Sequence, residues 1–256
     1  MIAPNLERRH SPMLLALFVL LAAIVLFAVQ TVFALLGVRI ANLFSYWSFD
    51  PDGAFAWISV HHIVQGALAL VLMGILALAF RLDFKLGLGD KRAGMRIVLW
   101  YTVILAAFEL VRWFGGNALS DPNLFDYPVN PRNVLGVLGF QLLLSGTSEE
   151  LLFRALPVTL LLLLTQKTFR LFRRRVQLPL SVIIAGVIFA MAHFSWTTNP
   201  FQLHFDVEQL LFAFVLGTIQ GWAYVKTGSI VYPMMMHGIY NTLNTGYSIV
   251  LPMLFL

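Results

Sequence analysis

The stretch that decides the fold is LLLSGTSEELLFR, residues 142–154, in which two adjacent glutamates interrupt an apolar run. An apolar run of this kind otherwise predicts a membrane-spanning helix. A charged side chain at the centre of such a helix costs about 2.5–3.5 kcal/mol on insertion scales. A chain that keeps Glu149 and Glu150 at this position is expected to give them partners and a use. The doublet therefore marks a candidate functional site inside a membrane helix.

The composition of the whole chain is that of an integral membrane protein. Its 256 residues are 59% hydrophobic and 11% charged, whereas a soluble domain carries roughly 25% charged residues. The absence of cysteine excludes disulfides, thiolate catalysis and cysteine-bound metal. The net charge of +5 comes from Lys and Arg that cluster in short loops, so it indicates membrane orientation and predicts no nucleic-acid partner.

The apolar segments predict an all-α fold, a polytopic transmembrane helical bundle with seven to eight spans in a single integral-membrane domain, residues 1–256. The segment 134–165 is either one tilted helix or two pieces that meet near Ser145, and the last segment could break near Gly246. The predicted segments are Met13–Leu36, Trp57–Phe80, Arg96–Phe114, Val134–Thr165, Pro179–Phe194, Glu208–Val225 and Ser229–Phe255.

The loops between these segments alternate in charge. Basic residues follow the second, fourth and sixth segments and also precede the first, and acidic residues occupy the loops between them. Because positively charged loops stay in the cytoplasm, this alternation predicts one crossing per segment and a cytoplasmic N-terminus. The first segment is too long for the core of a signal peptide and is interpreted as a retained span.

The two glutamates are expected to differ in their surroundings. Glu150 and Arg154 are four residues apart on one helix face, acid before base, which favours an ion pair. Glu149 points roughly 100° away around the helix, so one arginine cannot easily satisfy both acids. A carboxylate free to meet water is a candidate general base. The alternative for Glu149 is a structural acid bonded to a hydroxyl on a neighbouring helix.

Two later apolar segments carry further polar side chains. Phe189 and His193 lie four apart in one segment, and His237 and Asn241 lie four apart in another. Taken alone, His193 suits an interfacial group near a helix end, and the other pair suits hydrogen bonding between helices. Together with Glu149 they suit hydrolysis, in which one group activates water while donors hold the developing oxyanion. Glu149, His193 and His237 could instead bind a divalent metal such as zinc.

Other polar residues receive simpler interpretations. His61 and His62 follow Trp57 near the end of the second segment, a setting typical of interface anchoring. Glu109 and Arg112 are three apart and are expected to brace each other.

These motifs, in this order on separate apolar segments, resemble the CPBP family of intramembrane proteases. The family comprises the type II CAAX prenyl proteases and their bacteriocin-processing, Abi-like relatives. The resemblance lies in the patterns EExxxR at 149–154, FxxxH at 189–193 and HxxxN at 237–241, and in the segment 217–230. It covers a protease motif region at about residues 141–244. One departure is Ala155, where the family commonly has glycine.

The resemblance implies a helical bundle with a membrane-embedded catalytic cavity. It implies that Glu149 and His193 activate water, that His237 and Asn241 form the oxyanion site, and that Glu150 and Arg154, with Phe189 nearby, support them. The family has been described both as metal-dependent and as metal-independent. The spacing here favours the second, so no cofactor is expected to be required, with zinc as the alternative.

The predicted function is that of an intramembrane endopeptidase. Its expected partners are the lipid bilayer and a substrate, a membrane-associated protein or peptide, lipidated or not. Two alternatives stay open on the sequence. One is a non-catalytic scaffold or bacteriocin-immunity protein with the same fold. The other is a proton-coupled transporter that uses the carboxylate as a relay.

Overall fold

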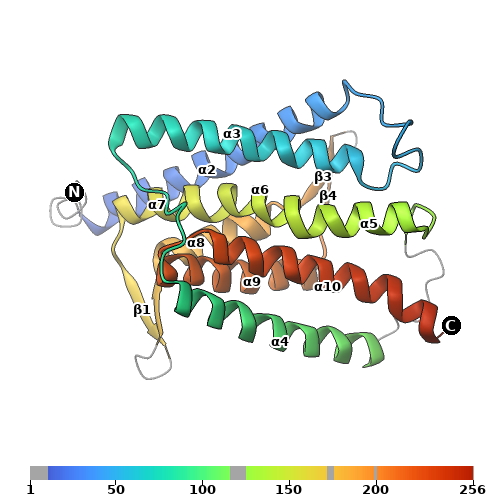
Figure 1. Ribbon diagram of the computed structural model, residues 1–256. Helices are drawn as coiled ribbons and strands as arrows, with labels where there is room; N and C mark the ends of the chain where they lie inside the picture. The colour runs from blue at the N-terminus through green and yellow to red at the C-terminus, as the bar shows by residue number, and fades with distance from the viewer. Residues whose placement is uncertain (1–10, 116–124, 172–175, 199–200, 256) are drawn as a thin grey trace.

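A computed structural model describes residues 11–115, 125–171, 176–198 and 201–255 of the chain. Seven helical rods make up most of the described residues and lie side by side in one bundle (Figure 1). The predicted all-α fold is therefore confirmed. Successive rods run in alternating directions, so that α2 (Pro12–Ala41) begins at one end of the bundle and α10 (Val231–Phe255) ends at the other.

The helices match the predicted segments closely. Helix α4 begins five residues before the predicted Arg96, because the carboxylate of Asp90 accepts a hydrogen bond from the Ala93 amide and extends the first turn. Helix α10 continues through Gly246, so the predicted break there is wrong. The remaining helices are α3 (Ala56–Phe80), α4 (Lys91–Gly115), α8 (Leu180–Met191) and α9 (Val207–Thr227).

The glutamate doublet lies in the middle of one continuous rod. The rod consists of α5 (Pro131–Phe140), η2 (Gln141–Ser145), α6 (Gly146–Glu150), η3 (Leu151–Ala155) and α7 (Leu156–Leu164). Of the two predicted alternatives, the single helix is therefore correct. The segments η2 and η3 are π-helical and flank the doublet on both sides. Such wide turns change the direction of side chains along a helix and recur at functional sites.

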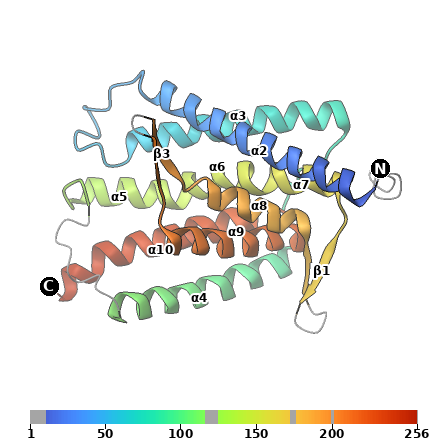
Figure 2. The same cartoon turned by 180° about the vertical axis from the view of Figure 1, so that it is seen from behind.

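Two short hairpins interrupt the helical pattern. Strands β1 (Thr168–Leu171) and β2 (Val176–Pro179) pair antiparallel between α7 and α8. Strands β3 (Ser195–Thr198) and β4 (Phe201–His204) pair antiparallel between α8 and α9. Helix α8 ends at Met191, three residues before the predicted Phe194, because the chain there turns into β3. Figure 2 shows α8 on the rear face, beside α9 and near α2.

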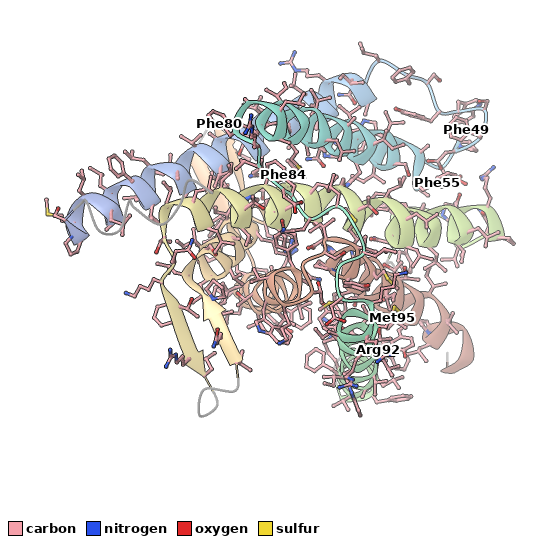
Figure 3. All side chains as sticks on the ribbon, turned by 60° about the vertical axis from the view of Figure 1, so that its left-hand side comes forward. Phe49, Phe55, Phe80, Phe84, Arg92 and Met95 are labelled. Atoms are coloured by element: carbon pink, nitrogen blue, oxygen red, sulfur yellow. The ribbon has the colours of Figure 1, made fainter. Side chains whose placement is uncertain are left out.

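The connection from α3 to α4 is anchored on the bundle. Phe84, labelled in Figure 3, belongs to this connection and is only 4% exposed within the main apolar cluster. The backbone carbonyl of Leu88 accepts a hydrogen bond from the Tyr232 hydroxyl, and that of Lys85 accepts one from the Ile230 amide. At the opposite end of α3, Phe55 packs against Gly136 of α5, where an added Cβ would lie 2.2 Å from the ring.

Four of the described helices are long and apolar enough to cross a membrane: α2, α3, α4 and α9. Helix α8 is apolar and shorter. The outer surface of α2 exposes large apolar side chains such as Ile24, Val25 and Leu35, as expected of a face in contact with lipid. The protein is therefore an integral membrane protein. The count of seven to eight spans and the cytoplasmic N-terminus stay predictions.

Candidate active site

A close crossing of α6 and α10 creates the site. A Cβ added to Gly146 would lie 2.8 Å from the backbone nitrogen of Gly238. A Cβ added to Gly238 would lie 2.4 Å from the carbonyl oxygen of Leu142. Only hydrogen fits at either position, as is common where membrane helices pack closely. This contact brings the glutamate doublet of α6 directly against His237 of α10.

Glu150 is completely buried and faces the interior of the bundle. Its Oε1 accepts a hydrogen bond from Nδ1 of His237 at 2.7 Å and lies 3.0 Å from Nη1 of Arg154. The predicted ion pair with Arg154 is therefore present. Among the described residues Nη1 makes no hydrogen bond, so charge attraction rather than a directed bond joins the two side chains.

Arg154 extends this network to three further helices. Its Nη2 donates to Oε1 of Gln220 on α9, and Nε2 of Gln220 donates to the hydroxyl of Tyr101 on α4 at 3.1 Å. The guanidinium also lies 4.0 Å from the ring centroid of Phe189 on α8, a cation–π contact. An arginine with zero exposure thus has a carboxylate, an amide and an aromatic face around it. This satisfies the requirement that buried charges be paired.

Glu149 faces a different environment. Its side chain is 23% exposed, and its Oε2 lies 3.6 Å from Nε2 of His237. Its Oε1 lies 4.0 Å from Nδ1 of His62 on α3. The carboxylate opens onto a cavity of about 390 Å³ that is lined by residues of α4, α6, α9 and α10 and of the C-terminal end of α8. The difference expected between the two acids is therefore present in the structure.

The same cavity receives all four predicted catalytic side chains. Glu149, His193, His237 and Asn241 all line it. The other lining residues are Phe108, Arg112, Phe189, Asp206, Glu208, Gln209, Phe212, Ala213, Leu216, Gln220, Tyr240 and Asn244. The mixture of carboxylates, imidazoles, amides and aromatic rings makes the cavity amphipathic, with a polar wall at α6 and α10.

His193 and His237 each have one ring nitrogen engaged by an acceptor. Nδ1 of His193 lies 3.0 Å from the carbonyl oxygen of Phe189, and a carbonyl can only accept. Nδ1 of His193 therefore carries a proton, so Nε2 is the ring nitrogen left for other partners. By the same reasoning, His237 donates from Nδ1 to the Glu150 carboxylate, which directs its Nε2 toward Glu149. The ring of Phe189 lies between the two imidazoles, in edge contact with both.

Asn241 is held by the helix that carries the doublet. Its Nδ2 donates to the hydroxyl oxygen of Ser145 at 3.0 Å. An amide nitrogen has two hydrogens, so one N–H remains available on the cavity side. Ser145 therefore accepts a hydrogen bond from α10.

The prediction for His61 and His62 is wrong. Both side chains are buried, at 9% and 8% exposure, and therefore do not anchor the helix at an interface. His62 contacts Ser148 and approaches Glu149, whereas His61 stacks on Trp57 and faces α2. A histidine one turn after a tryptophan in an apolar helix gives the same sequence pattern whether it is buried or lies at the membrane interface.

A second polar network joins α4 to α10 beside the cavity. Glu109 and Arg112 brace each other as predicted, with Nη2 of Arg112 at 2.8 Å from Oε2. The hydroxyl of Tyr240 donates to Oε1 of Glu109 at 2.9 Å, and Arg112 donates to Asn244 at 2.8 Å. Sequence reasoning did not include Tyr240 or Gln220 in the site. Each is a polar residue within an apolar segment, and one such residue is weak evidence for a functional site.

A metal site needs at least three ligand side chains gathered around one point. The described part of the chain contains no group of three His, Asp or Glu side chains arranged to hold a metal ion. The alternative in which Glu149, His193 and His237 bind zinc stays a prediction. Independence from cofactors stays a prediction.

The fold and the cavity define a helical membrane protein with a polar site enclosed in its bundle. Residues 131–243 match the model of a family described as type II CAAX prenyl endopeptidase Rce1-like. This match confirms the resemblance to the CPBP family of intramembrane proteases that the three motifs gave. No curated protein and no solved structure matches the chain. Helices α2, α3 and α4 lie outside the matched segment.

Proposed function

We propose that this protein is an intramembrane endopeptidase that hydrolyses peptide bonds with water activated by Glu149. The observation that carries the proposal is the single cavity that Glu149, His193, His237 and Asn241 all line. The family match supports a CAAX-protease-like endopeptidase in general. The mechanism and the substrate are finer proposals that rest on the geometry of the cavity.

In the proposed mechanism, water lies between Glu149 and His193. Glu149 accepts a proton from the water, and the oxygen attacks the carbonyl carbon of the scissile bond. The free Nε2 of His193 accepts the second hydrogen of the same water as a hydrogen bond and orients it. When the C–N bond breaks, the proton on Glu149 passes to the leaving nitrogen. Positioned acid–base groups of this kind contribute roughly 10²–10⁴-fold to a rate.

Helix α10 supplies donors for the oxyanion. Asn241 can donate from the N–H that Ser145 does not use. Nδ1 of His237 donates to Glu150. Nε2 of His237 can therefore donate to the oxyanion only when both ring nitrogens carry protons. The removal of one such donor costs about 10²–10³-fold in kcat in well-studied hydrolases. Both donors come from α10, so the pitch of this helix fixes their separation.

The proposed substrate is a membrane-associated protein or peptide, which reaches the cavity at or within the bilayer. The wall formed by Phe108, Phe212 and Leu216 is apolar and accommodates hydrophobic side chains, while the polar wall faces the peptide bond. A soluble peptide without an apolar segment would have little to contact on the first wall.

The test is hydrolysis of fluorogenic membrane peptides by the purified full chain in proteoliposomes. Wild type is expected to cleave at least one peptide of an apolar panel, and Glu149→Gln is expected to cleave none. Mass spectrometry of the products identifies the bond. Equal activity of the two proteins would overturn the proposal. If neither protein cleaves any peptide while a proton-coupled flux disappears in Glu149→Gln, the transporter alternative replaces it.

A further inference from the structure

We propose that His62 of α3 is a positioning residue for Glu149, so that the catalytic carboxylate is held between two imidazoles from different helices. The inference rests on the proposed function of Glu149 as the base. Helix α3 lies outside the segment that matches the family model, and none of the three sequence motifs contains His62. The site would therefore depend on the first half of the chain as well as on the motif half.

The contacts of His62 are directed at the turn of α6 that carries Glu149. Its Nδ1 lies 2.7 Å from Oγ of Ser148 and 4.0 Å from Oε1 of Glu149. The residue is only 8% exposed. A polar ring that is so deeply buried is under strong pressure to satisfy its nitrogens, and α6 provides the partners.

The hydrogen-bond pattern of Ser148 determines which atom carries the proton. Its Oγ lies 3.1 Å from the carbonyl of Leu144 and 3.2 Å from that of Ser145. Carbonyl oxygens only accept, and a hydroxyl has a single proton to give. In the arrangement that satisfies all of these contacts, Ser148 donates to the backbone and accepts from His62. This assigns the proton to Nδ1 of His62 and directs that N–H toward the Glu149 side of α6.

The packing of α3 holds the ring in this orientation. Gly66, one turn after His62 on the same face, brings α3 against Ser148, where an added Cβ would lie 3.4 Å from the serine Cβ. The ring of Phe140 packs edge-on against His62 with centroids 5.0 Å apart. Contacts on both sides leave the imidazole little rotational freedom.

The result is a carboxylate with one imidazole near each oxygen. Oε1 of Glu149 faces His62 at 4.0 Å and Oε2 faces His237 at 3.6 Å. Rotation of the carboxylate about its terminal torsion would carry an oxygen away from its imidazole. Both interactions therefore favour the orientation in which the carboxylate opens onto the cavity. A pre-oriented base lowers the cost of reaching the reactive geometry.

The neighbouring residue supplies a matched control. His61 is on the same helix and is equally buried, at 9% exposure. Its ring stacks on Trp57 at 5.5 Å and packs against Gly37 of α2, away from the doublet. Replacement of His61 by Phe removes the same polar nitrogens from the same helix and keeps an aromatic ring beside His62, which the His61 ring contacts at 5.3 Å.

The experiment compares His62→Phe, His62→Gln and His61→Phe in the full chain, with kcat, KM and melting temperature measured for each. His62→Phe is expected to lower kcat about 10²-fold with KM little changed, because a small misplacement of a catalytic group has that effect. His62→Gln restores an N–H donor and is expected to recover at least about a tenth of wild-type kcat. His61→Phe is expected to remain within about threefold of wild type.

Each other kinetic outcome overturns the inference. If His62→Phe retains wild-type kcat, the imidazole does not position the base. If His61→Phe and His62→Phe lose activity in parallel with melting temperature, His62 only packs. If His62→Gln is as inactive as His62→Phe, the donor has no role.

A second readout separates this inference from the proposed function. Nitrogen NMR of ¹⁵N-histidine-labelled protein in micelles reports the contact without any turnover. Glu149→Gln is expected to shift the ring signals of His62 and His237 and to leave those of His61 in place. If wild type cleaves no peptide but these shifts appear, the proposed function fails and the positioning contact stands. If the His62 signals do not move, the contact itself is refuted.

Discussion

The two glutamates of α6 lie in different environments, one suited to a structural role and the other to a catalytic role. On one side, Glu150 has zero exposure, and its network extends through Arg154 and Gln220 to Tyr101. On the other side, Glu149 is 23% exposed to a cavity, and the nearest imidazole nitrogens lie 3.6 and 4.0 Å away. Adjacent residues of identical chemistry thus occupy a sealed and an open environment.

The comparison shows how a membrane bundle can keep a reactive acid. The sealed side uses one carboxylate and one arginine to connect α6 with α4, α8, α9 and α10, and it fixes Nδ1 of His237. The open side then has a rigid frame in which the second carboxylate needs no tight partner. His237 belongs to both sides, since its two ring nitrogens face the two acids.

The largest effect on stability is expected from Arg154→Ala. It leaves Glu150 buried without its countercharge, and breaking a buried pair from one end costs about 3–5 kcal/mol. The free energy of unfolding in detergent micelles, followed by tryptophan fluorescence, measures the loss. Arg132→Ala is the control, because Arg132 is half-exposed in its pair with Asp52 and such pairs contribute about 0–1 kcal/mol. If the free energy of unfolding falls equally in both variants, the buried pair of Arg154 is no more important to stability than the half-exposed pair of Arg132.

A smaller effect is expected at the crossing of α6 and α10. Gly238→Ala places a Cβ 2.4 Å from the carbonyl oxygen of Leu142, and overpacking of this kind costs about 1–3 kcal/mol. Gly139→Ala is the control on the facing rod, which carries Leu142, since an added Cβ there meets nothing within 4 Å. Alanine is favoured over glycine in a helix by about 0.5–1 kcal/mol, so the control is expected to be slightly more stable than wild type. If Gly238→Ala is as stable as wild type, α6 and α10 can move apart at this contact without a loss of stability.

The smallest effect is expected outside the bundle, at Asp52 in the connection between α2 and α3. Hydrogen bonds from the side chains of Asn133 and then Arg132 hold the pKa of Asp52 below its ordinary value of 3.8. A carboxyl group with a lowered pKa stabilises the folded state above its ordinary pKa, and this contribution disappears as the pH falls through the folded value. The difference in melting temperature between wild type and Asp52→Asn is therefore expected to be largest at neutral pH. It should shrink below pH 3.8, as the pH falls through the lowered pKa of Asp52. A constant difference at all pH values would contradict this.

The sequence predicted the helices well because apolar runs of sufficient length have few alternatives in a membrane. The same reasoning missed both hairpins. Strands of four residues, such as Thr168–Leu171, are too short for an alternating pattern to stand out from a polar loop. It also could not anticipate the π-helical turns on either side of the doublet. Segment η2 packs against α10 and η3 packs against α8 and α9, all of which lie far along the chain.

For the site, spacing within one helix was informative and contact between helices was not. The interval from Glu150 to Arg154 predicted their ion pair, and the doublet predicted two different environments. His62 was misinterpreted because its partner Ser148 lies 86 positions away in the sequence. Gln220 was overlooked for the same reason, since its bonds to Arg154 and Tyr101 join residues that are far apart in the chain.

The most direct test measures two isosteric variants, Glu149→Gln and Glu150→Gln, side by side in the same micelles for peptide cleavage and melting temperature. Glu149→Gln is predicted to melt like wild type and to lose cleavage by about 10²–10⁴-fold. Glu150→Gln is predicted to melt at a distinctly lower temperature, because Arg154 is left buried without its countercharge. A Glu149→Gln protein that cleaves as fast as wild type, or a Glu150→Gln protein that is as stable as wild type, would contradict the division between an open catalytic acid and a sealed structural one.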